Sequence, residues 1–358
     1  MKLIKSGKAF RIFGDDLQTF NTLPSGTYRI QFAPMAGFYF EQVDDFTAIE
    51  EKIYGNHMEK IAKVLKSYQS VNRSLGAILS GDKGMGKSLF TQLLSSEVIK
   101  LGMPVIMVTQ PWPGVADFID SIDQECLVMF DEFEKVFNMD SDKGESQNDL
   151  LGLFDGTSQK KRLYVVTVNK LHQVSEYMVS RPGRFHYHIR FDYPSAGEIE
   201  VYLKDKLKSE YYSEIKHVIA FSNRVKLNYD SLRAIAFELN LGYSFNTAIS
   251  DLNILTTDAQ RYDIKIKFTN GKTVDIKGQK LNMFNETIRL DTHADGDWLS
   301  ISFDTSKIKT DYTQMIVDGS DVELITDGDN DLYKKDVKVV SVSITHYQDA
   351  GVNYRLAI

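Results

Sequence analysis

The stretch GDKGMGKS, residues 81–88, lies between an apolar run, GAILS at 76–80, and a second apolar run, LFTQLLSSEVIKLG at 89–102. It matches the spacing G-x-x-x-x-G-K-[S/T], and the flanking runs predict the strand and the helix that this pattern requires. Glycines in such a loop let successive backbone N–H groups face a phosphate at the positive end of the following helix. We therefore predict a phosphate-binding loop rather than a glycine-rich surface turn.

The residues of this loop have separate predicted roles. Lys87 is expected to neutralise the β- and γ-phosphates, and Ser88 is expected to bind Mg²⁺ through its hydroxyl. ATP and Mg²⁺ are therefore the predicted cofactors. The predicted nucleotide-binding residues of the loop are Gly81, Asp82, Lys83, Gly84, Met85, Gly86, Lys87, Ser88 and Leu89.

A second motif, CLVMFDE at 126–132, is an apolar run that ends in two carboxylates. A strand here would place Asp131 and Glu132 at its carboxyl end, where ligands collect in open α/β sheets. Asp131 is predicted to hold Mg²⁺ through water, and Glu132 is predicted to polarise the attacking water. A strand that merely ends at an acidic turn would explain this motif alone, but its pairing with the phosphate loop favours the site.

The apolar runs also predict the fold class, which is α/β. Short runs at 76–80, 104–109, 126–131, 162–168 and 187–191 alternate with helical stretches. Near-continuous apolar strands separated by helices predict a parallel sheet that is covered on both faces.

The regions that flank this α/β core have different sequence patterns. TYRIQF and FYFEQV, within residues 27–43, predict an N-terminal β hairpin. Residues 195–256 are helical throughout, and Asn270-Gly271 predicts a hairpin turn in a separate small all-β domain. The predicted domains are 1–45 (N-terminal β-rich segment), 46–194 (α/β nucleotide-binding core), 195–260 (helical segment) and 261–358 (C-terminal β domain).

Composition limits the class of protein. The chain has 358 residues, a formal net charge of −7 and a single cysteine, Cys126. The acidic balance does not indicate the basic face that is typical of sequence-independent nucleic-acid binding. No apolar run approaches the roughly 18–20 residues that span a bilayer. A cytoplasmic protein is the simplest interpretation, and the Lys-, Asn-, Tyr- and Asp-rich style would also suit a phage protein in a host cytoplasm.

Over about residues 46–256 the motifs and their order resemble an AAA ATPase of the classic clade. The resemblance implies a P-loop AAA+ core with an α-helical lid, in which GYSFNTAISDL (242–252) is the helix that closes over the nucleotide. It implies that Asn169, after the strand RLYVVTV, senses the γ-phosphate. It also implies that Arg181 and Arg184, in SRPGRF, reach a neighbouring subunit's nucleotide as arginine fingers. A solvated basic turn is the alternative for these two arginines.

Two further segments carry the resemblance. Ile53-Tyr54-Gly55 resembles the family's adenine-contacting segment, so Tyr54 and Gly55 are expected to bind the nucleotide. LLGLFDG at 150–156 and SRPGR are similar to the branch that contains the mitochondrial AAA protein translocating a folded Rieske iron–sulfur protein. The motor therefore resembles that translocase type most closely in pattern.

One connection departs from the protein-threading members of the family. Only QPWPGVADFIDSIDQE (110–125) lies between the second and third strands of the predicted core, which leaves little room for an aromatic-hydrophobic-glycine gripping loop. Trp112 could form a substitute grip, but the prolines on both sides of it favour a rigid turn. Ring-wide opening and closing around a folded or assembling client is more compatible with so short a connection than processive unfolding.

The leading hypothesis is an ATP-hydrolysing ring, implied by the resemblance to be a homo-hexamer, that remodels, translocates or assembles a protein client. The β domains are expected to recognise that client. Two alternatives stay open: a nucleic-acid-associated helicase or clamp loader, against which the acidic charge argues, and a slow nucleotide-gated scaffold.

Overall fold

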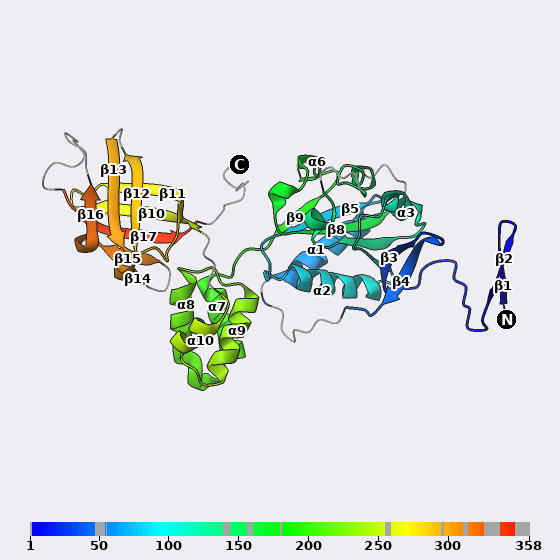
Figure 1. The fold of residues 1–358 in the computed structure, drawn as a ribbon, viewed down its shortest axis with the longest axis horizontal. Coiled ribbons are helices and arrows are strands. Elements are labelled where there is room, and N and C mark those ends of the chain that lie inside the picture. Colours follow the sequence, from blue (N-terminus) through cyan, green and yellow to red (C-terminus); the bar gives the residue numbers. More distant parts are fainter. Residues whose placement is uncertain are drawn as a thin grey trace. The chain divides into compact units, whose positions relative to one another are not determined.

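The computed structural model describes residues 2–46, 54, 56–138, 144–155, 160–179, 181–254, 259–294, 297–310, 314–325 and 337–347 (Figure 1). The chain divides into two compact units, Met1–Asp192 and Tyr193–Ile358. The first unit contains the predicted N-terminal segment and α/β core, and the second contains the predicted helical lid and β domain. The finer boundaries near residues 45 and 260 stay predictions.

A seven-stranded sheet with the order β4-β3-β6-β7-β8-β5-β9 forms the centre of the first unit. All neighbouring pairs are parallel except β3 and β4, which form an antiparallel hairpin. The α/β prediction is therefore confirmed. The strands are β3 (Thr27–Ala33), β4 (Gly37–Val43), β5 (Leu75–Ser80), β6 (Val105–Val108), β7 (Cys126–Phe130), β8 (Arg162–Val168) and β9 (Tyr187–Arg190).

The predicted N-terminal hairpin exists, and it extends the sheet of the core. Thr27 of β3 pairs with Val105 of β6, so the hairpin forms one edge of the seven-stranded sheet. Sequence periodicity could not reveal this pairing because it is a contact between segments far apart in the chain. Two earlier strands, β1 (Lys2–Ser6) and β2 (Ala9–Phe13), pair only with each other.

Alternate residues of a strand point to opposite faces of the sheet. Apolar side chains lie on both faces, and helices pack against both. Val128 and Phe130 of β7 face one apolar cluster, which also contains Ile119 of α3 and Phe154 of α5. Met129 faces the other side, where Ser95 of α2 donates a hydrogen bond to its sulfur at 3.2 Å. The helices of this unit are α1 (His57–Ser70), α2 (Lys87–Lys100), α3 (Val115–Ser121), α4 (Phe133–Val136), α5 (Leu151–Phe154), the 3-10 helix η1 (Leu171–Gln173) and α6 (Glu176–Val179).

The second unit begins with helices whose ends are set by capping residues. Ser195 forms a reciprocal capping box with Glu198, and the side chains of Asn228 and Ser244 accept hydrogen bonds from the first turns of the helices that follow them. Gly242, at φ +93°, follows the helix that begins at Tyr229 and lets the chain turn away from it. These elements are α7 (Ala196–Lys206), η2 (Ser209–Glu214), α8 (Ile215–Ser222), α9 (Tyr229–Asn240) and α10 (Phe245–Asp251).

The second unit continues as a small antiparallel β domain, as predicted. A five-stranded sheet, β11-β10-β17-β15-β14, and a three-stranded sheet, β12-β13-β16, enclose one apolar cluster. Gly271, at φ +81°, makes the predicted Asn-Gly turn. VNYRLAI at 352–358, whose pattern also predicts a strand, lies outside the described residues. The elements are β10 (Gln260–Phe268), β11 (Thr273–Leu281), β12 (Thr287–Ala294), β13 (Asp297–Asp304), η3 (Thr305–Lys307), β14 (Lys309–Thr310), β15 (Met315–Asp318), η4 (Gly319–Asp321), β16 (Val322–Ile325) and β17 (Val339–His346).

The end of α8 is anchored to this β domain by hydrogen bonds. The Tyr262 hydroxyl donates to the Arg224 carbonyl at 2.9 Å, and Arg224 Nη2 donates to the Ile308 carbonyl at 2.9 Å. His346 Nε2 lies 3.0 Å from the Ser222 carbonyl and must carry the proton there, because a carbonyl only accepts. The Tyr262 and His346 rings stack with centroids 4.8 Å apart. Three hydrogen bonds therefore join the helical segment to β10, to β17 and to Ile308 before β14.

His346 makes this junction sensitive to acid. Burial lowers the pKa of His346 to about 4, and its Nδ1 has no hydrogen-bond partner among the described residues. In the unfolded chain His346 binds a proton below about pH 6.5, whereas in the folded chain it does so only below about pH 4. The contribution of neutral His346 to the free energy of unfolding is therefore fully present above pH 6.5. It is lost as the pH falls toward 4, by about 3 kcal/mol for this group alone.

We therefore expect His346→Gln to flatten the pH dependence of unfolding between pH 6.5 and 4. Urea unfolding can be followed by the fluorescence of Trp298 in a Trp112→Phe background, since the chain has only two tryptophans. Both proteins share every other titrating group, so the difference between the two curves isolates His346. Parallel curves across this range would contradict the assignment.

Candidate nucleotide-binding site

The predicted phosphate loop has the backbone that its glycines allow. Gly84 and Gly86 have φ values of +75° and +93°, and Gly86 is the N-cap of α2. Gly81 has φ +151°, and its N–H donates to the Val168 carbonyl at 3.2 Å. A Cβ at Gly81 would lie 2.3 Å from the Phe191 carbonyl oxygen. Glycine is therefore required where β5 leaves the sheet between β8 and β9.

Lys87 lies within this loop and is only 8% exposed. Its ammonium donates to the Asp82 carbonyl at 2.8 Å and also to the Gly81 carbonyl. Burial lowers the pKa of Lys87, while Asp82 and the nearby carboxylates Asp131, Glu132 and Glu134 act in the opposite direction. The side chain is thus held at the start of α2, where a phosphate would meet both the ammonium and the backbone N–H groups.

A threonine that sequence reasoning missed joins the two predicted carboxylates. Thr167 Oγ1 donates to Asp131 Oδ1 at 2.5 Å and accepts from the Glu132 N–H at 2.8 Å. Thr167 belongs to the run RLYVVTV, where a threonine next to the end of a buried strand was the only signal. It orients Asp131 at the carboxyl end of β7, beside the phosphate loop.

Glu132 is positioned by a strained backbone and by neighbouring donors. Its φ of +46° is the only positive value among the described residues other than glycine. Its Oε1 accepts from Asn169 Nδ2 at 3.1 Å and from Lys135 Nζ at 2.5 Å, and Lys83 Nζ lies 3.9 Å away. The Lys135 hydrogen bond is the main cause that lowers the pKa of Glu132, so the carboxylate is ionised at neutral pH.

Glu134 is a further residue that the sequence did not single out. It is 6% exposed, and its Oε1 accepts from the Asn169 N–H at 3.0 Å. Its Oε2 is buried and has no partner among the described residues. Together with exposed Ser88 and Asp131, this free acceptor provides the oxygen-rich surroundings that Mg²⁺ and its bound waters require. The residues present therefore fit the predicted metal.

His57 connects the loop to the predicted adenine-contacting segment. Its Nδ1 lies 2.8 Å from the Tyr54 carbonyl, and its Nε2 would lie 3.1 Å from a Cβ at Gly86. Burial lowers the pKa of His57, so the ring is neutral at pH 7. Tyr54 is thereby tethered beside the loop. Gly55, the other residue expected to contact the base, lies outside the described residues.

The two predicted arginine fingers lie in different environments. Arg181 is exposed, with its guanidinium 5.9 Å from the centroid of the Tyr177 ring. Arg184 is buried and forms a two-pronged ion pair with Asp155, in which Nη2 and Oδ2 are 2.7 Å apart. Its Nη1 also donates to the Tyr177 carbonyl at 2.6 Å. The guanidinium of Arg184 thus makes its hydrogen bonds within its own chain. Of these two arginines, only Arg181 is exposed.

The Trp112 loop has the features of a rigid turn. The indole is partly buried against the apolar cluster and lies 5.8 Å from the Phe32 ring. The Gly114 N–H donates to Glu145 Oε1 at 2.8 Å, and the Glu145 N–H donates to the Pro111 carbonyl at 3.0 Å. These bonds on both sides of Trp112 favour the turn over the grip.

Comparisons with known proteins agree with the class of module that this geometry defines. Residues 77–193 match the ATPase family associated with various cellular activities (AAA). The ATP-dependent zinc metalloprotease FtsH of Aster yellows witches'-broom phytoplasma (strain AYWB) is 27% identical over 188 residues, which cover 47% of this chain and 27% of that protein. A RuvB mutant from Thermotoga maritima is 14% identical, with a TM-score of 0.42, and the match covers 57% of this chain and 73% of that one. Residues 77–193 are thus similar to the AAA family of ATPases.

Within the described part of the chain, no helix is long and apolar enough to cross a membrane. Over the same residues, no group of three or more His, Cys, Asp or Glu side chains could hold a metal ion by itself.

We expect Gly81→Ala to weaken nucleotide binding by about tenfold or more, because the new methyl group would displace the Phe191 carbonyl from the loop. The backbone clash should also lower the free energy of unfolding by about 1–3 kcal/mol. Binding of a fluorescent ADP analogue and urea unfolding measure the two effects. Gly152→Ala is the matched control, because a Cβ there has no atom within 4 Å. Equal affinities for the two variants would contradict the close-packing argument.

Proposed function

We propose that the chain hydrolyses ATP at the interfaces of a head-to-tail homo-oligomeric ring, a hexamer by resemblance, and uses this cycle to remodel, translocate or assemble a protein client. The observation that carries the proposal is the convergence of Lys87, Glu132 and Asn169 at the carboxyl ends of three adjacent parallel strands. Asn169 Nδ2 donates to the Glu132 carboxylate at 3.1 Å, so the predicted γ-phosphate sensor and the predicted base are in direct contact.

The residues of the site divide the chemistry of phosphoryl transfer between positioning and charge neutralisation. Lys87 and the loop N–H groups bind the phosphates, and Tyr54 and Gly55 hold the base. Ionised Glu132 accepts a hydrogen bond from the attacking water and so orients it. Mg²⁺, held by Ser88 and through water by Asp131, supplies positive charge to the phosphate oxygens when bound.

The sheet geometry supports a finger from a neighbouring subunit. The phosphate loop follows β5 at the carboxyl edge of the sheet, whereas Arg181 lies near the amino edge, where the Arg184 carbonyl approaches Gly76. The six residues of β5 span about 20 Å, which is longer than an arginine side chain. A subunit therefore cannot supply Arg181 to its own nucleotide. Repeated head-to-tail contacts would bring the two edges of successive copies together.

The two arginines receive different proposed roles. Arg181, exposed beside Pro182 and Gly183, is the finger. Arg184 positions that loop through its ion pair with Asp155, which holds the end of α5 against the segment after α6. Both residues were expected to be fingers on family resemblance, and the ion pair is the reason to separate them.

Coupling to the client is proposed to pass through the helical lid. The end of α8 is hydrogen-bonded to β10, to β17 and to the Ile308 carbonyl before β14, so lid movement would also move the β domain. Client recognition by the β domains stays a proposal. So does the likeness of the motor to the Rieske-protein translocase type, which rests on LLGLFDG, on SRPGR and on the short connection at 110–125. The similarity to FtsH covers 27% of that protein and supports an ATP-dependent motor rather than its protease activity.

We expect Glu132→Gln to retain ATP binding and to lower the hydrolysis rate by about 10²-fold or more, since the amide cannot act as a base. Lys87→Ala should lose nucleotide binding itself. Steady-state phosphate release and equilibrium binding of a fluorescent ATP analogue separate these effects. Unchanged hydrolysis in Glu132→Gln would overturn the catalytic assignment. Hydrolysis stimulated by DNA would favour the loader alternative, and slow turnover that no partner changes would favour the scaffold.

We expect Arg181→Ala to lower hydrolysis on the order of 10³-fold without weakening ADP binding, because the finger acts on a neighbour. Mixing Arg181→Ala with Glu132→Gln should restore part of the activity, since some interfaces would then combine an intact site with an intact finger. Arg184→Ala should instead lower the melting temperature, because Asp155 loses its partner. Absence of complementation between oligomer-forming variants would exclude a finger acting in trans.

A further inference from the structure

The strands β1 and β2 form a hairpin that is separate from the three larger sheets of the chain. Among the described residues they pair only with each other, in a register that places Leu3 opposite Ile12 and Lys5 opposite Phe10. A two-stranded hairpin is marginally stable at best in water, because it has no second layer to bury an apolar face. Contact with a further surface would therefore stabilise this hairpin.

One face of the hairpin is apolar. Residues directly opposite each other on paired strands share a face, and so do residues two apart on one strand. Leu3, Phe10 and Ile12 therefore lie on the same face, and they are 58%, 64% and 68% exposed. Large apolar side chains that are exposed together, unlike single ones scattered over a surface, indicate a contact site.

The same hairpin is basic. Residues 2–13 contain three lysines, one arginine and no aspartate or glutamate, although the whole chain has a net charge of −7. Lys8 is exposed in the turn between the strands, and the next carboxylates, Asp15 and Asp16, follow β2. Salt screens charges beyond about 8–10 Å at physiological ionic strength. A surface in contact with the hairpin is therefore influenced by these cations more than by the net charge of the chain.

An apolar face accompanied by cations and by no carboxylate is the combination that binds an anionic lipid surface. Apolar side chains enter the boundary between headgroups and acyl chains, while lysines keep their ammonium groups at the lipid phosphates. The Lys5 ammonium lies 5.6 Å from the centroid of the Phe10 ring, beside the apolar face. Nucleic-acid phosphates would meet the cations but would leave Leu3 and Ile12 in water. The apolar face thus favours lipid over nucleic acid.

We propose that the β1–β2 hairpin binds the surface of an anionic lipid bilayer, with Leu3, Phe10 and Ile12 inserted among the lipids and the lysines at the headgroups. The hairpin would lie on the bilayer surface. The inference goes beyond the proposed ATP hydrolysis and does not depend on it. It adds the place at which the proposed motor would act.

The test uses the full chain without nucleotide. Co-sedimentation is measured with vesicles of phosphatidylcholine alone and with vesicles of phosphatidylcholine mixed with anionic phosphatidylglycerol. Leu3→Ser/Ile12→Ser removes most of the apolar face and keeps the charge, whereas Lys5→Glu/Lys8→Glu reverses charge and keeps the apolar face. Near-UV circular dichroism checks the fold of the rest of the chain.

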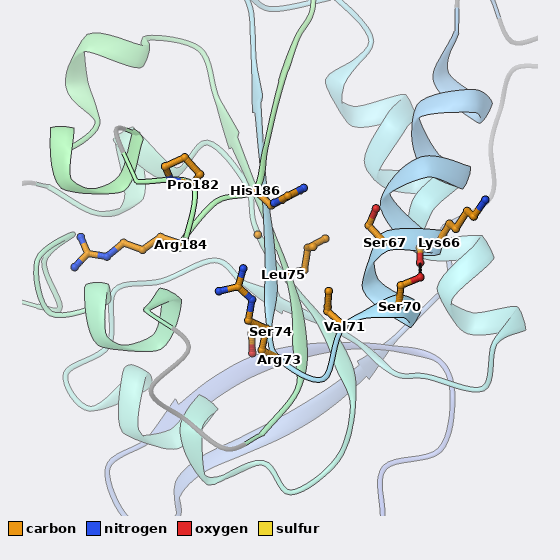
Figure 2. Close-up of a pocket in the computed structure, with 12 residues that line it drawn as sticks. Lys66, Ser67, Ser70, Val71, Arg73, Ser74, Leu75, Pro182, Arg184 and His186 are labelled. Atoms are coloured by element: carbon orange, nitrogen blue, oxygen red, sulfur yellow. Dashed lines mark hydrogen bonds between the residues drawn. The ribbon is translucent and has the colours of Figure 1, made fainter.

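Lys66→Glu/Arg73→Glu is the charge-matched control outside the hairpin. Lys66 and Arg73 are exposed, line a pocket (Figure 2), and have no ion-pair partner in the part of the chain that the structure describes. Leu75, which also lines that pocket, is buried, so an exposed apolar face does not accompany these two cations. Lys5→Arg/Lys8→Arg is the second control, because it keeps both the charge and the apolar face of the hairpin.

We expect the parent chain to bind the mixed vesicles about tenfold or more tightly than phosphatidylcholine vesicles, and less tightly as salt rises. Each of the two hairpin variants should weaken binding to mixed vesicles by about tenfold or more, whereas both controls should bind like the parent. The emission of Phe10→Trp should move to shorter wavelengths with mixed vesicles, relative to that of the parent, because the new indole would leave water. A hairpin that unfolded without inserting would not produce this shift.

Other outcomes would overturn the inference in distinguishable ways. Equal binding to both kinds of vesicle, or binding to neither, would exclude an anionic lipid surface as the partner. Vesicle binding that both hairpin variants retain would place the lipid contact elsewhere on the chain.

Two further outcomes would assign the hairpin to another partner. DNA binding that is lost in Lys5→Glu/Lys8→Glu and kept in Leu3→Ser/Ile12→Ser, without vesicle binding, would assign it to nucleic acid. Self-association in light scattering that is lost in Leu3→Ser/Ile12→Ser, again without vesicle binding, would assign it to a second copy of the chain. None of these measurements involves ATP hydrolysis, so the proposed function stands or falls separately.

Discussion

The parallel pairing of β5 between β8 and β9 is the constraint on which the rest of the first unit depends. Its register places Ser80 beside Val168 and Arg190, so the phosphate loop leaves the sheet next to Asn169 on one side and Phe191 on the other. The same pairing places Gly76 beside the Arg184 loop at the other end of the strand. The phosphate loop and the Arg184 loop thus lie at opposite ends of one buried strand, about 20 Å apart by strand rise.

The site obtains its precision from short polar contacts across this sheet. Thr167 connects the two carboxylates that follow β7, and Asn169 connects Glu132 to Glu134 through its side chain and its N–H. Thr167 lies near the end of β8 and Asn169 follows that strand, whereas Glu132 is the N-cap of α4 and Glu134 lies within it. Such cross-links fix the geometry of the site, as the proposed motor would require.

The second unit places a helical segment and a β domain in one body. Hydrogen bonds join the end of α8 to Tyr262, Ile308 and His346 through partly buried polar groups, and breaking them would leave each partner unsatisfied. In the proposed ring, this connection would convert lid closure into displacement of the β domain.

The sequence by itself determined the α/β class, the phosphate loop, the carboxylates after β7 and the Asn-Gly turn of the β domain, because each depends on local spacing and on which residues can adopt a given backbone. Tertiary structure decided the rest. The addition of the β3–β4 hairpin to the core sheet, the Thr167 bridge and the roles of Glu134 and His57 are contacts between distant segments, and they leave no periodic trace. The two arginines of SRPGRF look equivalent in sequence. Only folding, which brings Asp155 to Arg184 and leaves Arg181 exposed, distinguishes them, because the environment of a charged side chain depends on which groups the fold packs against it.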